Sequence, residues 1–207
     1  MSTIKSSSEH LTLNADGISK DIKFQANGVE KASISSAGAF TSTTIDATAL
    51  TGALPAISGA SLTGLTSSQM PTGSVLQVVN ATNATSTANS TTTYADTSLT
   101  ATITPTSTSS TILVLITQAW RKGTSDTSAM LKLLRGATDL GVFLVRPGNT
   151  GSGIDQNGVA AYNVIDSPAT TSATTYKTQF ASQNNAASVT INFDNDRSSI
   201  TLMEIAG

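Results

Sequence analysis

Nine short apolar segments follow one another between Val75 and Ile205, and polar, turn-forming residues separate them. Each segment is four to seven residues long and is rich in β-branched or aromatic residues. Short strands at this spacing are typical of a β-sandwich or a β-barrel. The pattern therefore predicts one all-β domain over residues 71–207. The predicted strands are 75–79, 99–103, 112–117, 130–134, 142–145, 159–165, 175–180, 189–193 and 200–205.

The composition favours the same fold class. The chain has 29 Ser and 35 Thr among its 207 residues, while charged residues make up only 12%. Thr is β-branched and favours strands. With 38% hydrophobic residues and little charge, the chain lacks the signature of a disordered protein. We expect an all-β protein whose surfaces are made polar by hydroxyl groups.

Several classes of partner are disfavoured. The net charge is −2, and Arg121-Lys122 is a single basic pair, so we expect no nucleic-acid partner. The longest aliphatic run, residues 112–116, is too short for a membrane helix, and we expect no membrane partner. The first residues lack the apolar region of a signal peptide, which predicts a soluble protein made in a cytoplasm.

The N-terminal residues differ from the rest in charge. Residues 1–31 hold eight charged side chains, whereas residues 32–120 hold only Asp46 and Asp96. Alternation around Ile22 and Phe24, followed by Asn27-Gly28, predicts a hairpin with a three-residue loop over residues 26–28. We expect residues 1–45 to form a unit of three or four short strands.

Residues 46–70 contain the sequence ALTGALPAISGASLTGL, which has no charge. Each of its glycines would destabilise a helix by ~1 kcal/mol and Pro55 by ~3 kcal/mol. Its large apolar side chains nevertheless need burial, which two further copies around a threefold axis would provide. We therefore predict a trimeric Gly/Ala-rich neck; the alternative is a flexible linker. The predicted neck contacts are Leu50, Leu54, Ile57, Leu62 and Leu65.

Catalytic constellations are scarce. His10 is the only histidine and there is no cysteine, so the usual triads and the His- or Cys-based metal sites cannot be assembled. No phosphate-binding or dinucleotide motif occurs. Asp194 and Asp196 could bind a cation or act as paired acids, but a tight turn explains the same residues. We expect no enzyme, no metal and no cofactor.

Trp120 and Arg121 are the candidate binding residues. The sole tryptophan follows a predicted strand and could stack on a sugar ring while Arg121 donates hydrogen bonds. A tryptophan at this position could equally cap a core or lie in a subunit interface, because its side chain carries a large burial energy.

The phrases LTLNADGISKDIKFQANGVEKASISSAGAF and SGASLTGLTSSQMPTGSVLQVV resemble the fibre and tail-fibre proteins of bacteriophages. TYADTSLTATITPTSTSSTILVLITQ, TSATTYKTQFAS and SSITLMEIAG are similar to their distal domains, so the resemblance runs from Leu11 to Gly207. It implies a homotrimeric virion fibre with a β-rich distal domain for host attachment. Phage tail fibres are often much longer, which leaves tail, baseplate and capsid open as attachment sites.

We therefore expect an all-β trimeric fibre of the virion, made in the host cytoplasm. Residues 1–45 would attach to another virion protein, residues 46–70 would form the neck, and residues 71–207 would form a β-sandwich of the jelly-roll type. Polar loops of this sandwich, at 80–93, 124–127 and 146–158, would bind a host-surface glycan. The alternatives are a capsid-attached head fibre, a glycan depolymerase using Asp194 and Asp196, and a surface adhesin, which the missing export signal disfavours.

Overall fold

The computed structural model describes residues 19–42, 66–147 and 151–207. The chain divides into two compact units, residues 1–61 and 62–207. In the described ranges the regular elements are β-strands and short 3-10 turns. The predicted limits of the neck stay predictions, since its five apolar contacts lie outside the described residues. Those contacts are Leu50, Leu54, Ile57, Leu62 and Leu65.

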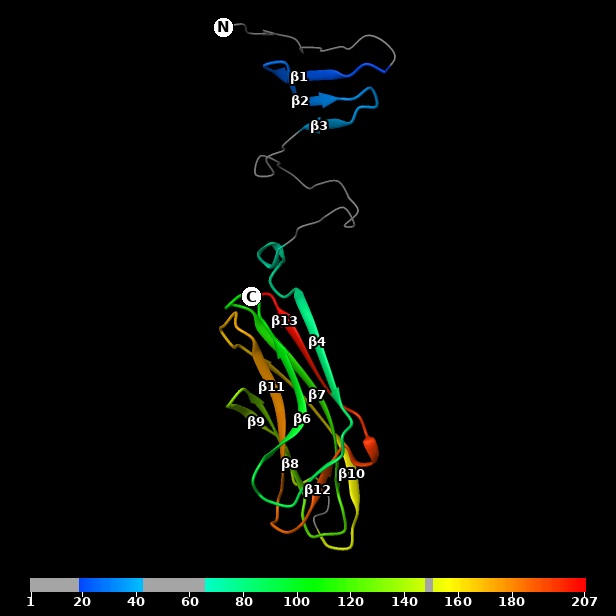
Figure 1. Cartoon of the computed structure of the whole chain (residues 1–207), viewed down its shortest axis with the longest axis vertical. Helices are drawn as coiled ribbons and strands as arrows, with labels where there is room; N and C mark the ends of the chain where they lie inside the picture. Colours follow the sequence, from blue (N-terminus) through cyan, green and yellow to red (C-terminus); the bar gives the residue numbers. More distant parts are fainter. Residues whose placement is uncertain (1–18, 43–65, 148–150) are drawn as a thin grey trace. The chain divides into compact units, whose positions relative to one another are not determined.

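The first unit contains an antiparallel sheet in the order β1-β2-β3 (Figure 1). The predicted three-residue loop is wrong. Ala26 pairs with Val29, so the turn has two residues, Asn27 and Gly28, both with positive φ (52° and 74°). This is the combination that a two-residue hairpin turn of type I′ requires. The strands are β1 (Ile22–Ala26), β2 (Val29–Ile34) and β3 (Phe40–Ser42).

A β-bulge reconciles this shorter turn with the hydrophobic pattern. Phe24 pairs with Ala32, but Gln25 pairs with Glu30, which leaves Lys31 as an extra residue on β2. An extra residue on one strand shifts the alternation by one position. The apolar residues therefore still share a face, as the alternation predicts.

The second unit is a β-sandwich of two antiparallel sheets (Figure 1). The first sheet has the order β4-β13-β7-β10, and the short strands β12 and β5 continue it beside the C-terminal half of β7. The second sheet has the order β6-β11-β8-β9. The first sheet comprises β4 (Val75–Asn83), β5 (Thr87–Asn89), β7 (Thr111–Lys122), β10 (Gln156–Asp166), β12 (Val189–Ile191) and β13 (Ser198–Ile205); the second comprises β6 (Ala95–Ile103), β8 (Ala129–Arg135), β9 (Thr138–Val145) and β11 (Thr174–Ser182).

The pairings of the eight main strands are nested. The innermost pair is β8 with β9, followed outward by β7 with β10, β6 with β11, and β4 with β13. The chain thus runs as one long antiparallel ribbon folded across the two sheets.

All nine predicted strands are confirmed, although most are longer than predicted. The predicted loop at 80–93 is wrong, because β4 continues to Asn83 and β5 lies within it. Asn80 Nδ2 donates to Thr201 Oγ1 at 2.8 Å across the β4–β13 pair. Polar cross-strand pairs of this kind hold a strand without the apolar alternation that marks a strand in the sequence.

The core between the sheets consists of two apolar clusters. Side chains of β6, β7, β8, β11 and β13 form the first, and side chains of β7, β8, β10, β11 and β12 form the second around Trp120. The first cluster contains Leu99, Ala101, Ile103, Ile112, Val114, Ile116, Leu133, Tyr176, Ile200 and Leu202; the second contains Trp120, Ala129, Leu131, Ala160, Phe180, Val189 and Ile191.

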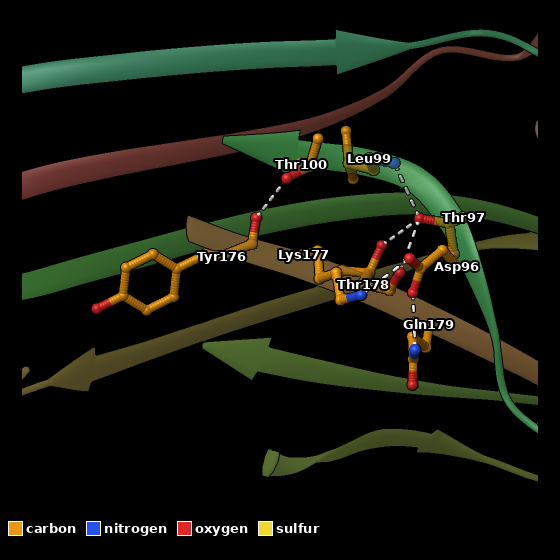
Figure 2. A network of polar contacts seen from close by, with 8 residues as sticks. All are labelled: Asp96, Thr97, Leu99, Thr100, Tyr176, Lys177, Thr178 and Gln179. Carbon is orange, nitrogen blue, oxygen red and sulfur yellow. Dashed lines mark hydrogen bonds and ion pairs between the residues drawn. The ribbon is translucent and has the colours of Figure 1, made fainter. Parts of the chain in front are cut away.

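A buried polar network also joins the two sheets. Thr97 Oγ1 lies 2.5 Å from Thr178 Oγ1 on the second sheet (Figure 2), and Thr178 donates to Gln118 Oε1 at 2.9 Å. Gln118 Nε2 donates to Ser198 Oγ at 2.8 Å and to Asn192 Oδ1 at 3.3 Å. All five side chains belong to fully buried residues. Because a buried polar group without a partner is costly, this network fixes how the sheets stack.

Glu204 forms buried hydrogen bonds at the end of the sandwich where β4 begins and β13 ends. Its residue is fully buried, and its carboxylate accepts hydrogen bonds from Thr106 N (2.7 Å), Thr106 Oγ1 (2.7 Å) and Gln77 Nε2 (2.6 Å). Burial alone would raise the pKa of this carboxyl, but the hydrogen bonds from Gln77 and Thr106 outweigh it and hold the pKa below its ordinary value of 4.5.

We expect Glu204→Gln to lower the free energy of unfolding by about 1–3 kcal/mol at pH 7, since the amide NH₂ faces donors and cannot accept from them. A depressed folded-state pKa contributes stability above the unfolded-state value and loses it as the pH falls through the folded-state value. The difference between wild type and variant should therefore shrink below the ordinary value of 4.5. Urea unfolding between pH 3 and 7 measures it; a constant difference would contradict the role of this carboxylate.

Candidate functional site

The start of β4 and the last residues after β13 lie at one end of the sandwich. Gly73 N donates to Ala206 O at 2.8 Å, and Ala206 N donates to Ser74 O at 2.9 Å, so the start of β4 lies beside Gly207. Figure 1 shows this end of the sandwich and, opposite to it, a group of loops. We call the opposite end the distal end and define it by the loops 90–94, 123–128, 151–155 and 183–188.

Hydrogen bonds join two of the distal loops directly. Ala186 N donates to Ser90 O at 2.8 Å, and Thr92 N donates to Asn185 Oδ1 at 3.1 Å. Loop 183–188 is also bonded to loop 123–128, because Asn184 Nδ2 donates to the backbone oxygen of Asp126 at 2.8 Å. The loops therefore form one connected surface.

Lys122 attaches the fourth loop. Its residue is fully buried, and Nζ donates to Ser125 O (3.2 Å) and to Gly151 O (2.7 Å). Arg121-Lys122 is the basic pair that the sequence analysis judged too small for a nucleic-acid partner. Alternation along β7 separates the pair, since Lys122 points into the sandwich and Arg121 points outward.

Ile154 and two carboxylates, Asp126 and Asp155, are exposed at the distal end, but most exposed side chains there are hydroxyls, together with the amide of Asn185. Such groups donate and accept hydrogen bonds without a strong field of one sign. This surface is chemically suited to a hydroxyl-rich, uncharged ligand. The exposed hydroxyl and amide residues are Ser90, Thr91, Thr92, Thr93, Thr124, Ser125, Ser152, Asn185 and Ser188.

Trp120 is buried beneath this end. It is only 8% exposed and packs in the second core cluster with Val189 and Phe180. Gly158 lies opposite on β10, where an added Cβ would come within 3.2 Å of the indole ring, so glycine makes room for the tryptophan. Its burial favours the core role of this residue over the sugar-stacking role.

Arg121 lies on the outward side of β7, with a side chain 28% exposed. Its Nε donates to both carboxylate oxygens of Asp155 (2.9 and 3.1 Å), and Nη2 forms a further ion pair with Asp155. The guanidinium also lies 3.8 Å above the ring centroid of Phe193. The hydrogen bonds between Arg121 and Asp155 raise the pKa of Arg121 and lower that of Asp155, so both side chains stay charged at neutral pH.

The structure thus does not bring the two predicted contact residues together. Arg121 instead groups with Asp155 and Phe193, which the sequence placed in a turn and at the end of a strand. Asp155 lies in the loop 146–158 that was predicted to bind a glycan, whereas Phe193 carried no signal for a site. The group forms only when three separate segments meet.

Asp194 and Asp196 lie on the turn between β12 and β13. The turn contains the 3-10 element η4 (Phe193–Asn195), with left-handed φ values at Asn192 (51°) and Asp194 (56°). Asn and Asp tolerate this conformation better than other side chains do. The conformation supports the turn interpretation. In the described ranges, no group of three or more His, Cys, Asp and Glu side chains could hold a metal ion.

We expect Asp194→Asn and Asp196→Asn to change the free energy of unfolding by roughly 1 kcal/mol or less, since both are exposed turn residues. Host attachment should be unchanged. Chemical unfolding and an assay for reducing-end release from host polysaccharide check both points. A polysaccharide cleavage by the wild type that these variants lose would establish the depolymerase instead.

No helix of the described part of the chain is long and apolar enough to cross a membrane.

No protein-family model and no curated protein matches the chain. Two similar solved structures are those of infectious bursal disease virus, from the Gx strain (9% identity, TM-score 0.37) and the Gt strain (11% identity, TM-score 0.36). The matches cover 64% and 65% of this chain but only 37% and 39% of the chains in those structures.

Proposed function

We propose that this protein is a homotrimeric tail fibre of a virion and that the distal end of its sandwich binds a glycan on the host surface. The observation that carries the proposal is that the chain enters the sandwich from the preceding unit at one end, beside its last residues, and that the loop cluster lies at the opposite end. A domain held in this way presents its opposite end to a partner, and here that end is a connected surface of loops. Loops on a rigid scaffold are frequent sites of recognition.

The chemistry of the distal end supports a glycan as the ligand. Hydroxyl and amide side chains can exchange hydrogen bonds with sugar hydroxyls, and Arg121 over Phe193 adds a charged donor beside an aromatic face. Individual contacts of this kind are weak. Three copies in each fibre and several fibres on each particle would raise the avidity without new contacts.

The nested strand pairing supports the jelly-roll type, because the eight main strands, four in each sheet, contain two Greek keys when joined in this order. The proposed architecture further comprises a trimeric neck over residues 46–70 and a region, residues 1–45, that docks onto another virion protein. The dense charge of that first region suits docking into a larger assembly.

Competition for host cells tests the function. The purified full chain should reduce adsorption of the virus, because it occupies the receptor. Arg121→Ala should raise the concentration needed for half-maximal competition about tenfold or more, the equivalent of one lost charge-assisted hydrogen bond. Lys177→Ala is the matched control, since it removes an exposed ion pair (with Asp96, 2.8 Å) on the outer face of the second sheet.

The control should compete like the wild type. If the wild-type chain does not compete at any concentration, the proposed receptor binding is wrong. If Arg121→Ala and Lys177→Ala compete equally well, the distal end is not the contact surface.

A further inference from the structure

The outer face of the first sheet carries no charge except near Arg121, at the C-terminal end of β7. Side chains at outward positions of β4, β13 and β10, and of β7 as far as Thr117, are all uncharged. The pairing register aligns one apolar row across the four strands: Val78, Met203, Leu113 and Ile165. Val78 is 55% exposed and Ile165 is 64% exposed. We call this surface the neutral face.

The next row along the neutral face continues the pattern. It consists of Asn80, Thr201, Leu115 and Asn163, again without an ionisable group. Leu115 and Thr201 also line a shallow hollow in this face. Apolar side chains and small amides or hydroxyls without charge are the composition of the interior of a protein interface.

The outer face of the second sheet is different. Asp96 accepts from Lys177 (2.8 Å) and Gln179 (2.7 Å), as Figure 2 shows, and Lys132 pairs with Asp139 (3.2 Å). A face with such ion pairs is suited to water. The two outer faces of one sandwich therefore differ in the way that a solvated surface differs from a covered one.

The edge of β10 also favours contact with another chain. Its eleven residues pair with β7 without any register shift, whereas the pairings of the edge strands β4 and β6 each contain one shift and that of β9 contains two. Strand β10 has no proline or lysine and exposes Val159 and Ile165. Open edges are normally interrupted by bulges, prolines or charges, because an unprotected edge invites association.

Charge selects the occupant of this face. Nucleic acid and anionic lipid require Lys or Arg, and neither occurs on the neutral face. Another copy of the chain presents an equally uncharged surface and meets no like charge. Four strands ~4.8 Å apart and about seven residues at ~3.3 Å give roughly 440 Å² of flat face for each copy. Buried on each of two copies, this area approaches the ~1,000 Å² of a specific interface. Around a threefold axis each contact joins different surfaces of two copies, so the neutral face of one copy meets the edge of β10 on the next.

We propose that the neutral face, together with the free edge of β10, is the contact between copies of the sandwich in the homotrimer. This inference goes beyond the proposed function, since it requires self-association and no receptor. The charged outer face of the second sheet then faces water, and the distal ends of the three copies remain accessible.

Single-cysteine variants test this proposal in the full chain, which has no cysteine of its own. Ile165→Cys and Val159→Cys place a thiol on the neutral face. Val145→Cys on β9 is the matched control, because Val145 is 58% exposed in a single chain, close to the 64% of Ile165. The reaction of each variant with a maleimide is followed by mass spectrometry, with light scattering on the same samples.

We expect about tenfold slower labelling of Ile165→Cys and Val159→Cys than of Val145→Cys, the factor that 1.4 kcal/mol of protection supplies. The difference should disappear once dilution or mild denaturant separates the copies while circular dichroism still reports a folded sandwich. Equal labelling rates in the oligomer, a folded monomer in light scattering, or protection that persists in separated copies would each overturn the proposal. A failure of host binding would change none of these readings.

Discussion

Trp120→Ala lowers the free energy of unfolding of the sandwich by about 3–5 kcal/mol, the range for removing a large buried aromatic side chain. The indole is 8% exposed and packs against Leu131, Phe180 and Val189 of the second core cluster. Removing it leaves a cavity between the sheets. Gly158, whose backbone lies against the ring, cannot fill that cavity with a side chain.

Urea unfolding followed by circular dichroism measures this loss, and Phe193→Ala is its control. Phe193 is an aromatic residue at the same end of the sandwich but is 37% exposed, so its removal should cost about 1 kcal/mol. If Trp120→Ala instead kept full stability and lost only host attachment, the sugar-stacking role of Trp120 would be correct and its core role wrong.

Gln118→Leu also destabilises the sandwich, by about 3 kcal/mol, although the two side chains have similar size. The leucine would leave Thr178 without its acceptor and would leave Ser198 and Asn192 without the amide donor, all in a fully buried site. Each buried polar group that loses its partner costs about 1–3 kcal/mol. The network that ties the sheets together would be broken at its centre.

Gln179→Leu is the matched control for this prediction. The same substitution there removes one hydrogen bond to Asp96 on the outer face of the second sheet (Figure 2), where water can replace it. Its effect should stay within about 0.5 kcal/mol. Equal effects of the two substitutions in urea unfolding would show that the buried network contributes no special stability.

Most of the sandwich could be predicted from its sequence, because alternation of apolar residues follows the two faces of a strand. The run of residues 112–116 is apolar on both faces, which predicts either a central strand or one covered by another subunit. In the structure β7 is central, with β13 and β10 on its two sides. Its outward Leu113 and Leu115 lie on the neutral face. Our proposal therefore also includes the other alternative, in which another subunit covers this strand.

The elements that sequence reasoning missed lack an apolar signal. The extension of β4 to Asn83 rests on polar pairs such as Asn80 with Thr201, and β5 is only three residues long. The turn at Asn27 and Gly28 is one residue shorter than the alternation predicts, because the bulge at Lys31 shifts the alternation by one position. Bulges depend on the partner strand, which the local sequence does not specify.

The candidate site was predicted less well than the fold. Neighbouring residues on a strand point to opposite faces, so Trp120 and Arg121 could not both face one ligand while β7 stayed regular. The partners of Arg121 come from the loop before β10 and the turn after β12. Their meeting is a consequence of the nested strand order, and no spacing in the sequence encodes it.

A density map of intact virions that carry this chain is the decisive measurement for the proposed function. Our account predicts three copies in each fibre, with the loops 90–94, 123–128 and 183–188 pointing away from the particle and residues 1–45 at the attachment point. Such density on the capsid instead of the tail would identify a head fibre. Absence of the chain from the particle, or distal loops buried in the particle, would contradict the account.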